Sequence, residues 1–310
     1  MIDPLQLVSI VTPSFNQAQF LEETIRSVLN QDYPRIEYIV IDGGSTDESV
    51  EIIEKYEGQL VYWVSEPDRG QAHAINKGWQ RATGEIVAYL NSDDLYTADA
   101  VTTAVRALLS NPDVCMVYGD ALVIDEHSDV IWQAPATPFN ISGVITTKVK
   151  MPQPSVFVRR SALDTVGLLD ERLHYCMDYD LWIRLGLTCP GLYLSGVALS
   201  KMRAHAAAKS TAAAAAFPLE RRRVLNKVYA RDDLPLAVQQ VRRQAYSYMC
   251  FDQAAIAARF NQPQHILQPL LRAAVESPSY IVSRPLDVIY LLLRSWLPWW
   301  KGKPVTTPNV

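Results

Sequence analysis

The sequence has few cysteines for its length, and their spacing excludes two common kinds of small scaffold. Only Cys115, Cys176, Cys189 and Cys250 occur in 310 residues, and no two of them form a CxxC pair. Neither a zinc knuckle nor a disulfide framework is therefore expected. A reducing compartment, the cytoplasm, fits this cysteine usage best.

Long apolar runs are also missing. Residues 1–12 contain no basic segment followed by an apolar one, so no secretory signal is expected. The most apolar stretch lies near the C-terminus, where Arg284, Asp287 and Arg294 interrupt it, so we do not expect a membrane-spanning helix. A GxGxxG motif is absent after the first predicted strand, which disfavours a dinucleotide-binding dehydrogenase.

Basic residues are scarce in the first two-thirds of the chain and acidic residues in the last third. Residues 201–310 hold 16 Lys and Arg against 6 Asp and Glu, which leaves 13 and 27 for residues 1–200. This asymmetry predicts two regions with different partners. Nucleic acid is not expected among them, because no recognised binding motif accompanies the basic excess.

Apolar residues alternate between the period of a strand and that of a helix along the first part of the chain. The expected strands cover residues 7–12, 36–42, 60–65 and 85–91, with helical patterns in the intervals. Such alternation predicts an α/β fold in which helices flank a mostly parallel sheet. We expect this domain to cover residues 1–211 and a helical C-terminal region to cover residues 212–310.

Polar residues fall at the end of each predicted strand. Thr12 and Pro13 close the first strand, Asp42 closes the second, and residues 65–69 and 91–94 follow the third and fourth. In an open parallel sheet, ligands bind in the crevice outside the carboxyl ends of the strands. The pattern therefore predicts a ligand site at this edge.

Two adjacent carboxylates, Asp93 and Asp94, follow the fourth predicted strand in the stretch YLNSDD. Adjacent carboxylates repel each other unless a positive group lies nearby. Oxygen ligands of this kind suit Mg²⁺ or Mn²⁺, which share their remaining coordination positions with phosphate and water. The alternative is a solvated turn that caps the helix beginning near Ala98. The residues of this stretch alone leave both interpretations open.

Four longer stretches together carry a resemblance to a known family. They are VSIVTPSFNQAQFLEETIRSVLNQ, YIVIDGGSTDES, SEPDRGQAHAINKGWQRATGEIVAYLNSDD and DERLHYCMDYDLWIRL. In this order, over residues 7–206, the chain resembles the inverting family 2 glycosyltransferases of the GT-A fold. The resemblance implies a nucleoside-diphosphate-sugar donor, with uridine as the favoured base, a divalent cation (Mn²⁺ or Mg²⁺), and an aspartate base that activates an acceptor hydroxyl.

The resemblance also implies roles for individual residues. The implied nucleotide-binding residues are Thr12, Pro13, Phe15, Asp42, Arg69, Lys77 and Asp93, and the implied metal ligands are Asp94 and His205. The chain departs from the family pattern at two positions. Asn91 stands where many members have the first aspartate of a DxD motif, and Gly43 replaces the second acid of a common DDGS motif. Arg203 or Lys209 could offset phosphate charge.

The resemblance places the catalytic base at Asp178, in the segment CMDYD, with Asp180 as the rival candidate. Inverting chemistry needs one carboxylate that deprotonates the acceptor as it attacks the sugar. Asp178 could instead, or in addition, cap the helix that follows it. His205 has a similar alternative, because a lone histidine in a loop is more often a surface residue than a ligand.

The end of the chain combines cations with Trp296, Trp299 and Trp300. This combination suits an anionic membrane surface, where tryptophan rings lie at the headgroup level. We therefore expect a cytoplasmic protein, peripheral on the inner face of the cell membrane, with a glycan or lipid-linked acceptor. Packing of the last helix on the catalytic domain is the alternative. For the whole chain, a nucleotidyltransferase of similar fold and an inactive nucleotide- or glycan-binding module remain alternatives.

Overall fold

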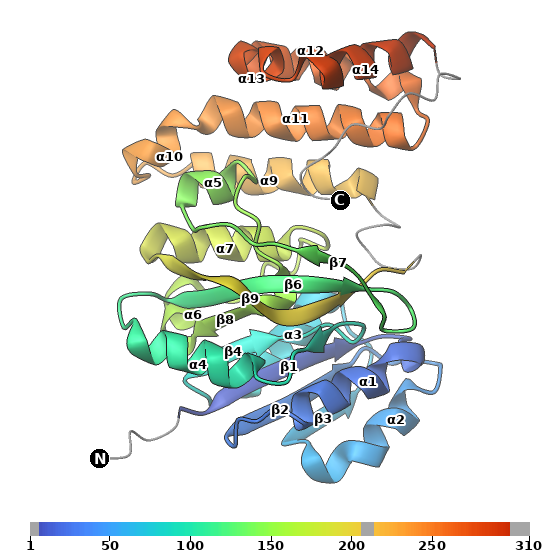
Figure 1. Ribbon diagram of the computed structural model, residues 1–310, viewed down its shortest axis with the longest axis vertical. Coiled ribbons are helices and arrows are strands. Elements are labelled where there is room, and N and C mark those ends of the chain that lie inside the picture. The colour runs from blue at the N-terminus through green and yellow to red at the C-terminus, as the bar shows by residue number, and fades with distance from the viewer. Residues whose placement is uncertain (1–5, 206–213, 298–310) are drawn as a thin grey trace. The chain divides into compact units, whose positions relative to one another are not determined.

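The computed structural model describes residues 6–205 and 214–297 (Figure 1). The chain forms two compact units. The first comprises residues up to 140 together with 150–205, and the second comprises residues 141–149 and those from 206 onward. The boundary predicted at residues 211 and 212 lies outside the described residues.

One mixed sheet forms the centre of the first unit, in the order β3-β2-β1-β4-β8-β6-β9-β5, with β7 paired to β6. Its strands are β1 (Val8–Ser14), β2 (Ile36–Asp42), β3 (Tyr62–Ser65), β4 (Ile86–Tyr89), β5 (Leu95–Tyr96), β6 (Met116–Ile124), β7 (Val130–Ala134), β8 (Val156–Arg159) and β9 (Gly191–Arg203). Strands β1 to β4 run parallel to one another, as the alternating pattern predicts. Strand β8 pairs antiparallel with β4 and β6, while β9 runs parallel to β6 and antiparallel to β5.

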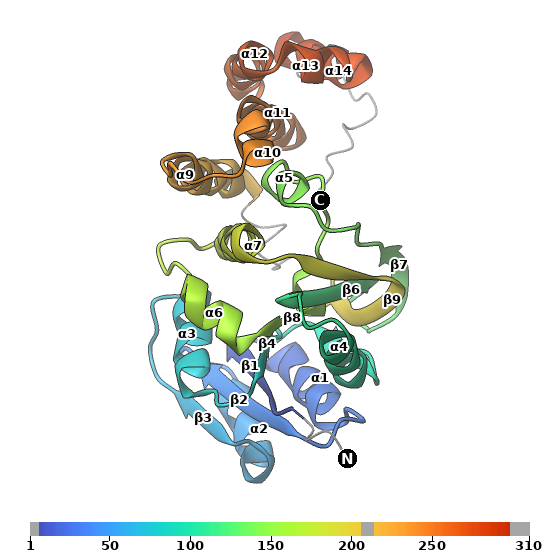
Figure 2. The same ribbon diagram turned by 90° about the vertical axis from the view of Figure 1, so that its left-hand side faces the viewer.

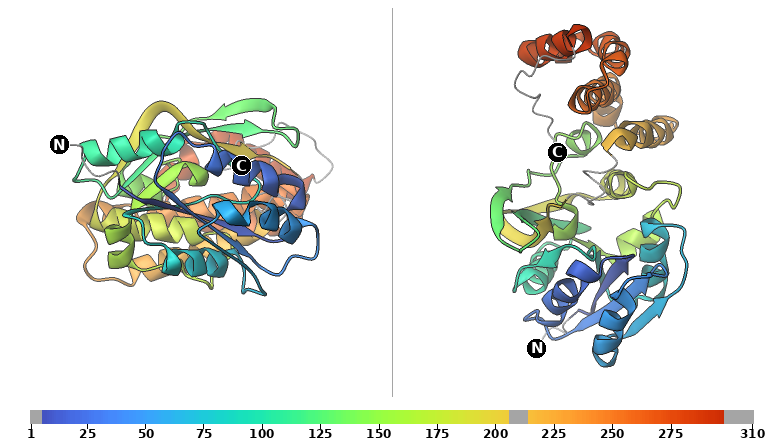
Figure 3. Two further views of the ribbon diagram at one scale, coloured as in Figure 1. Left: turned by 90° about the horizontal axis from the view of Figure 1, so that it is seen from below. Right: turned by 90° about the vertical axis from the view of Figure 1, so that its right-hand side faces the viewer.

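Helices cover both faces of this sheet. They are α1 (Ala18–Leu29), α2 (Ser49–Tyr56), α3 (Gln71–Arg81), α4 (Ala100–Ser110), α6 (Arg160–Val166) and α7 (Met177–Thr188). Figures 2 and 3 show α1 and α4 on one face and α3 and α6 on the other. Strand β1 serves both faces because its side chains alternate: Ile10 joins the core under α1 and α4, and Val11 contacts Gly78 of α3. The GT-A-like arrangement predicted from the sequence is thus present.

The second unit is helical, as expected. It contains α5 (Ile141–Ile145), α9 (Phe217–Tyr229), α10 (Leu236–Gln240), α11 (Arg242–Arg259), α12 (Leu267–Glu276), α13 (Pro278–Val282) and α14 (Pro285–Trp296). Within the described ranges, no helix combines the length and the apolar character that crossing a bilayer requires.

Three segments differ from the sequence expectation. The Pro, Gly and Thr content of residues 134–152 predicts a loop, but this stretch contains α5; the sequence over 237–260 predicts a helix, but it forms two helices because the chain leaves the helical path at Val241. Strand β9 was not expected at all. Its exposed middle, residues 195–197, interrupts the alternation that would have identified a strand.

The close contact between α3 and β1 predicts an effect on stability. A β-carbon at residue 78 would lie 2.7 Å from Cγ2 of Val11 and closer still to Cγ1. Because overpacking outweighs the better helix propensity of alanine, Gly78→Ala should lower the free energy of unfolding by about 1 to 2 kcal/mol. Gly58→Ala is the matched control, since nothing lies within 4 Å of its added β-carbon. Equal urea midpoints for the two variants would contradict this packing.

Candidate active site

The carboxyl ends of the four parallel strands meet at one edge of the sheet. Register pairs Ser14 of β1 with Asp42 of β2, and Asp42 with Ser65 of β3. On the other side of β1, Tyr89 of β4 pairs with Val11. The polar residues that follow these strands are therefore neighbours, as the sequence predicts.

The turn Asn91–Asp94 follows β4 and carries the two adjacent carboxylates. The backbone N–H of Asp94 donates to the carbonyl oxygen of Asn91 at 3.1 Å, which closes the turn. Asn91 also donates its side-chain amide to Oδ2 of Asp94 at 3.1 Å. An aspartate at residue 91 would add a third charge here, whereas the amide supplies a donor. The departure from the DxD motif thus relieves the crowding of the two carboxylates.

Asp94 is buried, with 7% of its surface exposed. Its burial, and next the charge of Asp93, raise its pKa well above the ordinary value. The backbone N–H of Arg203, at 3.1 Å from Oδ1, the Asn91 amide and the Arg203 charge all oppose this shift. The ionised form of a buried carboxyl group whose pKa is raised in this way is stabilised when a further positive group lies beside it.

Arg203 is the positive group that the described chain places beside this turn. Its guanidinium is buried and donates to the carbonyl oxygen of Asp93 at 3.0 Å and to the Glu23 carboxylate at 2.6 Å. Further bonds reach the carbonyl oxygen of Asp125 and the hydroxyl of Ser128, both at 2.9 Å. These bonds turn the guanidinium toward Glu23 and the β6–β7 loop, so the predicted use of Arg203 against phosphate is not supported. Lys209 lies outside the described residues.

His205 joins the acidic turn two residues after β9 ends. Its Nε2 lies 3.0 Å from Oδ2 of Asp93, and only 5% of its side chain is exposed. The ring of Phe20 packs against the imidazole, with 4.9 Å between the ring centroids. His205 is therefore a buried member of the cluster and not a surface residue. Oxygen and imidazole ligands of this kind are compatible with Mn²⁺ or Mg²⁺. In the described residues, no group of three or more His, Cys, Asp or Glu side chains is arranged to hold a metal ion by itself.

Asp178 lies in the first turn of α7, and its charge acts on Tyr89, which is buried at the end of β4. Burial raises the pKa of Tyr89 well above its ordinary value, and the charges of Asp178 and Asp94 raise it further. Both carboxylates therefore lie within electrostatic range of the Tyr89 hydroxyl. Asp178 also accepts the backbone N–H of Tyr179 at 2.7 Å, but α7 begins at Met177 with Cys176 as its N-cap, so Asp178 is not the helix cap that the sequence offered as its alternative.

The rival base, Asp180, has a structural role. Its side chain is 1% exposed and forms an ion pair with Arg184 at 2.7 Å. Arg184 in turn donates to the carbonyl oxygens of residues 166, 167 and 168. The pair thus fixes the loop after α6 against α7, and Asp180 is not available to an acceptor.

The residues expected at the nucleobase divide into buried and exposed groups. Thr12 and Pro13 lie inside β1 and are buried, and the Thr12 hydroxyl is 3.0 Å from the hydroxyl of Tyr38. Asp42 is also buried, and its carboxylate accepts bonds from Gly44, Ser45 and Ser65. Three of its four donors reach Oδ2 and one reaches Oδ1. Oδ1 therefore keeps capacity for another donor.

Asp68 is a residue of this edge that the sequence analysis did not single out. A β-carbon added to Gly43 would lie 2.7 Å from Oδ2 of Asp68 and 3.3 Å from Cδ2 of Phe15. Asp68 also accepts the backbone N–H of Gly70 at 2.6 Å, which holds its carboxylate in place. The carboxylate from the loop after β3 thus occupies the space of the side chain missing at residue 43. Beside it, the Phe15 ring is 59% exposed.

The two cations expected near the phosphates are paired with carboxylates. Arg69 contacts Glu171 at 2.5 Å and keeps 69% of its side chain exposed. Lys77 contacts Glu66 at 2.6 Å and is mostly covered. Both pairs lie around the loop between β3 and α3.

Comparison with solved structures identifies the class of fold. TarS of S. aureus, residues 1–349, aligns with a TM-score of 0.66 and 18% identity, covering 94% of this chain and 89% of that one. The mannosyltransferase PcManGT of Pyrobaculum calidifontis, solved with GDP-Man and Mn²⁺, aligns with a TM-score of 0.61 and 19% identity, covering 96% and 81%. This architecture, with its acidic turn after β4, is the GT-A fold of glycosyltransferases.

Sequence comparison then assigns the family. The model of glycosyl transferase family 2 matches residues 9–167. An uncharacterized glycosyltransferase of Mycobacterium tuberculosis is 35% identical over 188 residues, which cover 59% of this chain and 70% of the relative. The putative teichuronic acid biosynthesis glycosyltransferase TuaG of Bacillus subtilis is 42% identical over 185 residues, covering 53% and 73%. The chain belongs to glycosyl transferase family 2.

The contact between residues 43 and 68 predicts a measurable coupling. Gly43→Asp should destabilise the protein, because the new side chain meets the held carboxylate of Asp68. In an Asp68→Ala background the same change should cost less, with a coupling energy on the order of 1 kcal/mol. A double-mutant cycle of urea unfolding measures this term. Additive effects would mean that Asp68 does not occupy the vacant side-chain position.

Proposed function

We propose that this glycosyltransferase transfers a sugar, with inversion, from a uridine diphosphate donor to a hydroxyl of a glycan or lipid-linked acceptor. The carrying observation is the cluster of Asp93, Asp94 and His205, with Asp94 buried and the charges of Asp94 and Asp178 both acting on Tyr89. TarS has been solved with UDP-GlcNAc and with UDP, and TuaG is named for teichuronic acid synthesis. These names favour synthesis of a cell-surface polysaccharide.

In the proposed mechanism, Asp178 is the base. It removes the proton of the acceptor hydroxyl while that oxygen attacks the anomeric carbon from the face opposite the departing diphosphate. A single displacement of this kind inverts the configuration.

On the donor side, Asp94 and His205 would hold Mn²⁺ or Mg²⁺, and Asp93 would contact the donor. Such an ion would offset the negative charge that develops on the leaving diphosphate. The donor set fits, because Asp94 gains from an added positive charge and His205 already lies within the acidic cluster. The remaining coordination positions would go to donor oxygens and water.

The nucleoside would lie over the ends of β1 and β2. Phe15 offers an exposed ring for stacking, and Oδ1 of Asp42 retains acceptor capacity for the base. Thr12 and Pro13, which are buried in β1, would lie beneath the nucleoside. Arg69, in the loop before α3, and Lys77, on α3 itself, would have to exchange Glu171 and Glu66 for phosphate.

We place this activity in the cytoplasm, on the inner face of the cell membrane. Helix α14 supports that placement because it exposes Leu286, Ile289 and Trp296, with exposed fractions of 80%, 52% and 78%. Apolar side chains at this spacing form one stripe along a helix. Trp299 and Trp300 lie outside the described residues.

The assignment of the base is tested by a matched pair of variants. Asp178→Asn should lower transfer by about 10² to 10⁴-fold while leaving donor affinity and the melting temperature nearly unchanged. Asp180→Asn should instead cost about 3 kcal/mol of stability, because it breaks a buried ion pair, and the folded fraction should keep its transfer rate. Turnover and thermal unfolding measure both. If Asp178→Asn turned over like the native enzyme, the base would lie elsewhere.

The metal and donor assignments are tested by thermal shift. A panel of sugar nucleotides should raise the melting temperature more with Mn²⁺ than with EDTA, since a ligand that binds the native state stabilises it. Asp94→Asn should lose the increment due to Mn²⁺ and keep the shift due to nucleotide alone. Equal shifts with and without metal would contradict the metal site. Release of pyrophosphate from a nucleoside triphosphate would indicate a nucleotidyltransferase instead.

A further inference from the structure

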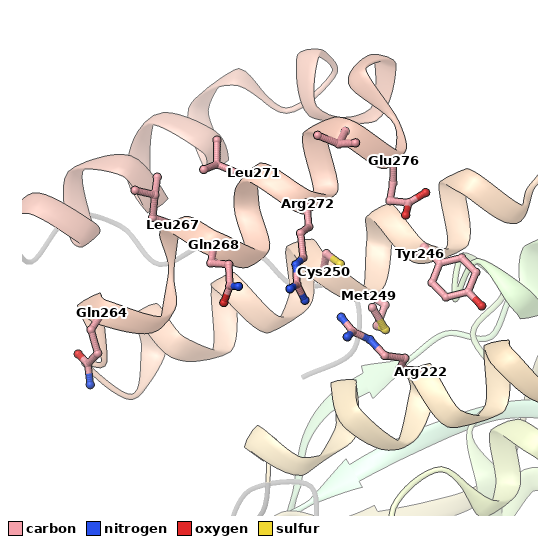
Figure 4. Close-up of a pocket in the computed structure, with 11 residues that line it drawn as sticks. Arg222, Tyr246, Met249, Cys250, Gln264, Leu267, Gln268, Leu271, Arg272 and Glu276 are labelled. Atoms are coloured by element: carbon pink, nitrogen blue, oxygen red, sulfur yellow. The ribbon is translucent and has the colours of Figure 1, made fainter.

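The helical unit contains a groove for which the catalytic scheme has no use. It has a volume of about 780 Å³ and lies between α9, α11 and the segment from η4 (Pro263–His265) through α12 (Figure 4). A groove of this size is in the range of small-molecule sites. All of its lining residues belong to the second unit.

One wall of the groove is apolar. Leu267, Leu271 and Val275 follow one another at intervals of four residues and therefore form one stripe along α12. Their exposed fractions rise along the helix, from 38% through 58% to 72%. Met249 and Cys250 of α11 form the buried floor. A contiguous apolar surface of this kind, left open to water, marks a binding surface more often than a chance exposure.

Two arginines enter the groove from opposite sides. Figure 4 shows Arg222 extending from α9 and Arg272 extending from α12 toward α11. Both also act on the Cys250 thiol: burial raises its pKa, the charge of Arg222 and its side-chain hydrogen bond lower it, the charge of Glu276 raises it, and the charge of Arg272 lowers it. The two cations therefore lie near the same atom, where they repel each other.

Neither arginine has a carboxylate at ion-pair distance within the described residues. Glu276 also lines the groove, one turn after Arg272, but it forms no ion pair with either cation. The neighbouring Arg221 shows the contrast, because it is buried against Asp252 in an ion pair. Arg221 thus serves the packing of α9 on α11, whereas Arg222 and Arg272 leave an excess of positive charge in the groove.

We propose that this groove binds a lipid phosphate, with the phosphate between Arg222 and Arg272 and the hydrocarbon chain along Leu267, Leu271 and Val275. Guanidinium groups bind phosphate oxygens through paired, charge-assisted hydrogen bonds. An adjacent apolar wall removes the first part of the chain from water. Only a ligand with both parts satisfies both features of the groove.

The charge of the groove also decides against the chain's own end as occupant. Residues 298–310 contain Lys301 and Lys303 and no Asp or Glu, so they do not complement two arginines. The acidic catalytic unit of a second copy could supply negative charge, and the oligomeric state tests that outcome. The proposal does not depend on the transferase activity, since lipid binding here requires neither donor nor metal.

Calorimetry with three probes, used below their micelle concentrations on the full chain, tests the proposal. Decyl phosphate should bind at one saturable site, while inorganic phosphate and decyl maltoside should bind at least about tenfold more weakly, because each satisfies only one half of the groove. Equal binding of inorganic phosphate would reduce the groove to an anion site and overturn the proposal. Equal binding of decyl maltoside would overturn it as well.

Variants locate the site. Arg222→Ala and Arg272→Ala should each weaken decyl phosphate binding about tenfold or more, as expected for loss of a charge-assisted bond. Leu271→Ser should weaken it without changing the response to inorganic phosphate. Arg223→Ala and Arg259→Ala are matched controls, because these arginines lie on α9 and α11 but do not line the groove. Unchanged affinity in both groove variants would overturn the proposal.

Vesicles extend the test to a membrane source. Cosedimentation with phosphatidylcholine vesicles containing phosphatidic acid should fall in the Arg222→Ala/Arg272→Ala double variant and persist in the Arg223→Ala/Arg259→Ala control. Thermal unfolding confirms that each variant is folded. If the double variant instead changed the oligomeric state and kept its affinity for decyl phosphate, the groove would be a contact between copies and the proposal would be wrong.

Discussion

The buried guanidinium of Arg203 is the interaction on which the arrangement of the acidic edge depends. It joins the end of β9 to Asp93 in the turn after β4, to Glu23 on α1 and to the β6–β7 loop. Because Arg203 ends β9, the same bonds fix where the chain goes next and bring His205 onto Asp93. A buried charge with this many partners cannot be moved without leaving several polar groups unsatisfied. The histidine is thus positioned by a cation that does not face the site.

This constraint divides the acidity of the site between structure and chemistry. Asp180 is neutralised by Arg184 and holds α7 against the loop after α6, while Asp178, two residues earlier in the same helix, lies within electrostatic range of Tyr89. Asp42 is intermediate between the two, because donors from its own loop and from β3 hold it while its Oδ1 keeps capacity for one more donor. Carboxylates that are paired within the protein, as Asp180 is, fix the shape of the crevice. Carboxylates with fewer hydrogen-bond partners can bind ligands. The carboxylate with the raised pKa, Asp94, is the one with most to gain from a cation.

Sequence reasoning predicted the parallel part of the sheet because each strand there is a short apolar run that ends in a polar cluster. It missed β9, whose exposed middle breaks the alternation, so the pattern alone could not place His205, two residues after that strand, beside Asp93. It chose Asp178 as the base but kept Asp180 as a rival, because the ion pair that occupies Asp180 is formed one helical turn away and is held by carbonyl groups of another segment. Contacts made across the fold, such as Asp68 beside Gly43, leave no periodic pattern along the chain.

The two departures from the family pattern are accommodated in different ways. At residue 91 an amide replaces a carboxylate and donates to Asp94, so the number of charges in the turn falls while the number of hydrogen bonds is kept. At residue 43 the acid is lost from β2's loop, and Asp68 brings a carboxylate to that space from the neighbouring strand end. A sheet edge on which four strands end can exchange side chains in this way, because the position of a carboxylate matters to a ligand and its place in the sequence does not. A motif that lacks an acidic residue in one segment can therefore have that carboxylate supplied by another segment of the fold.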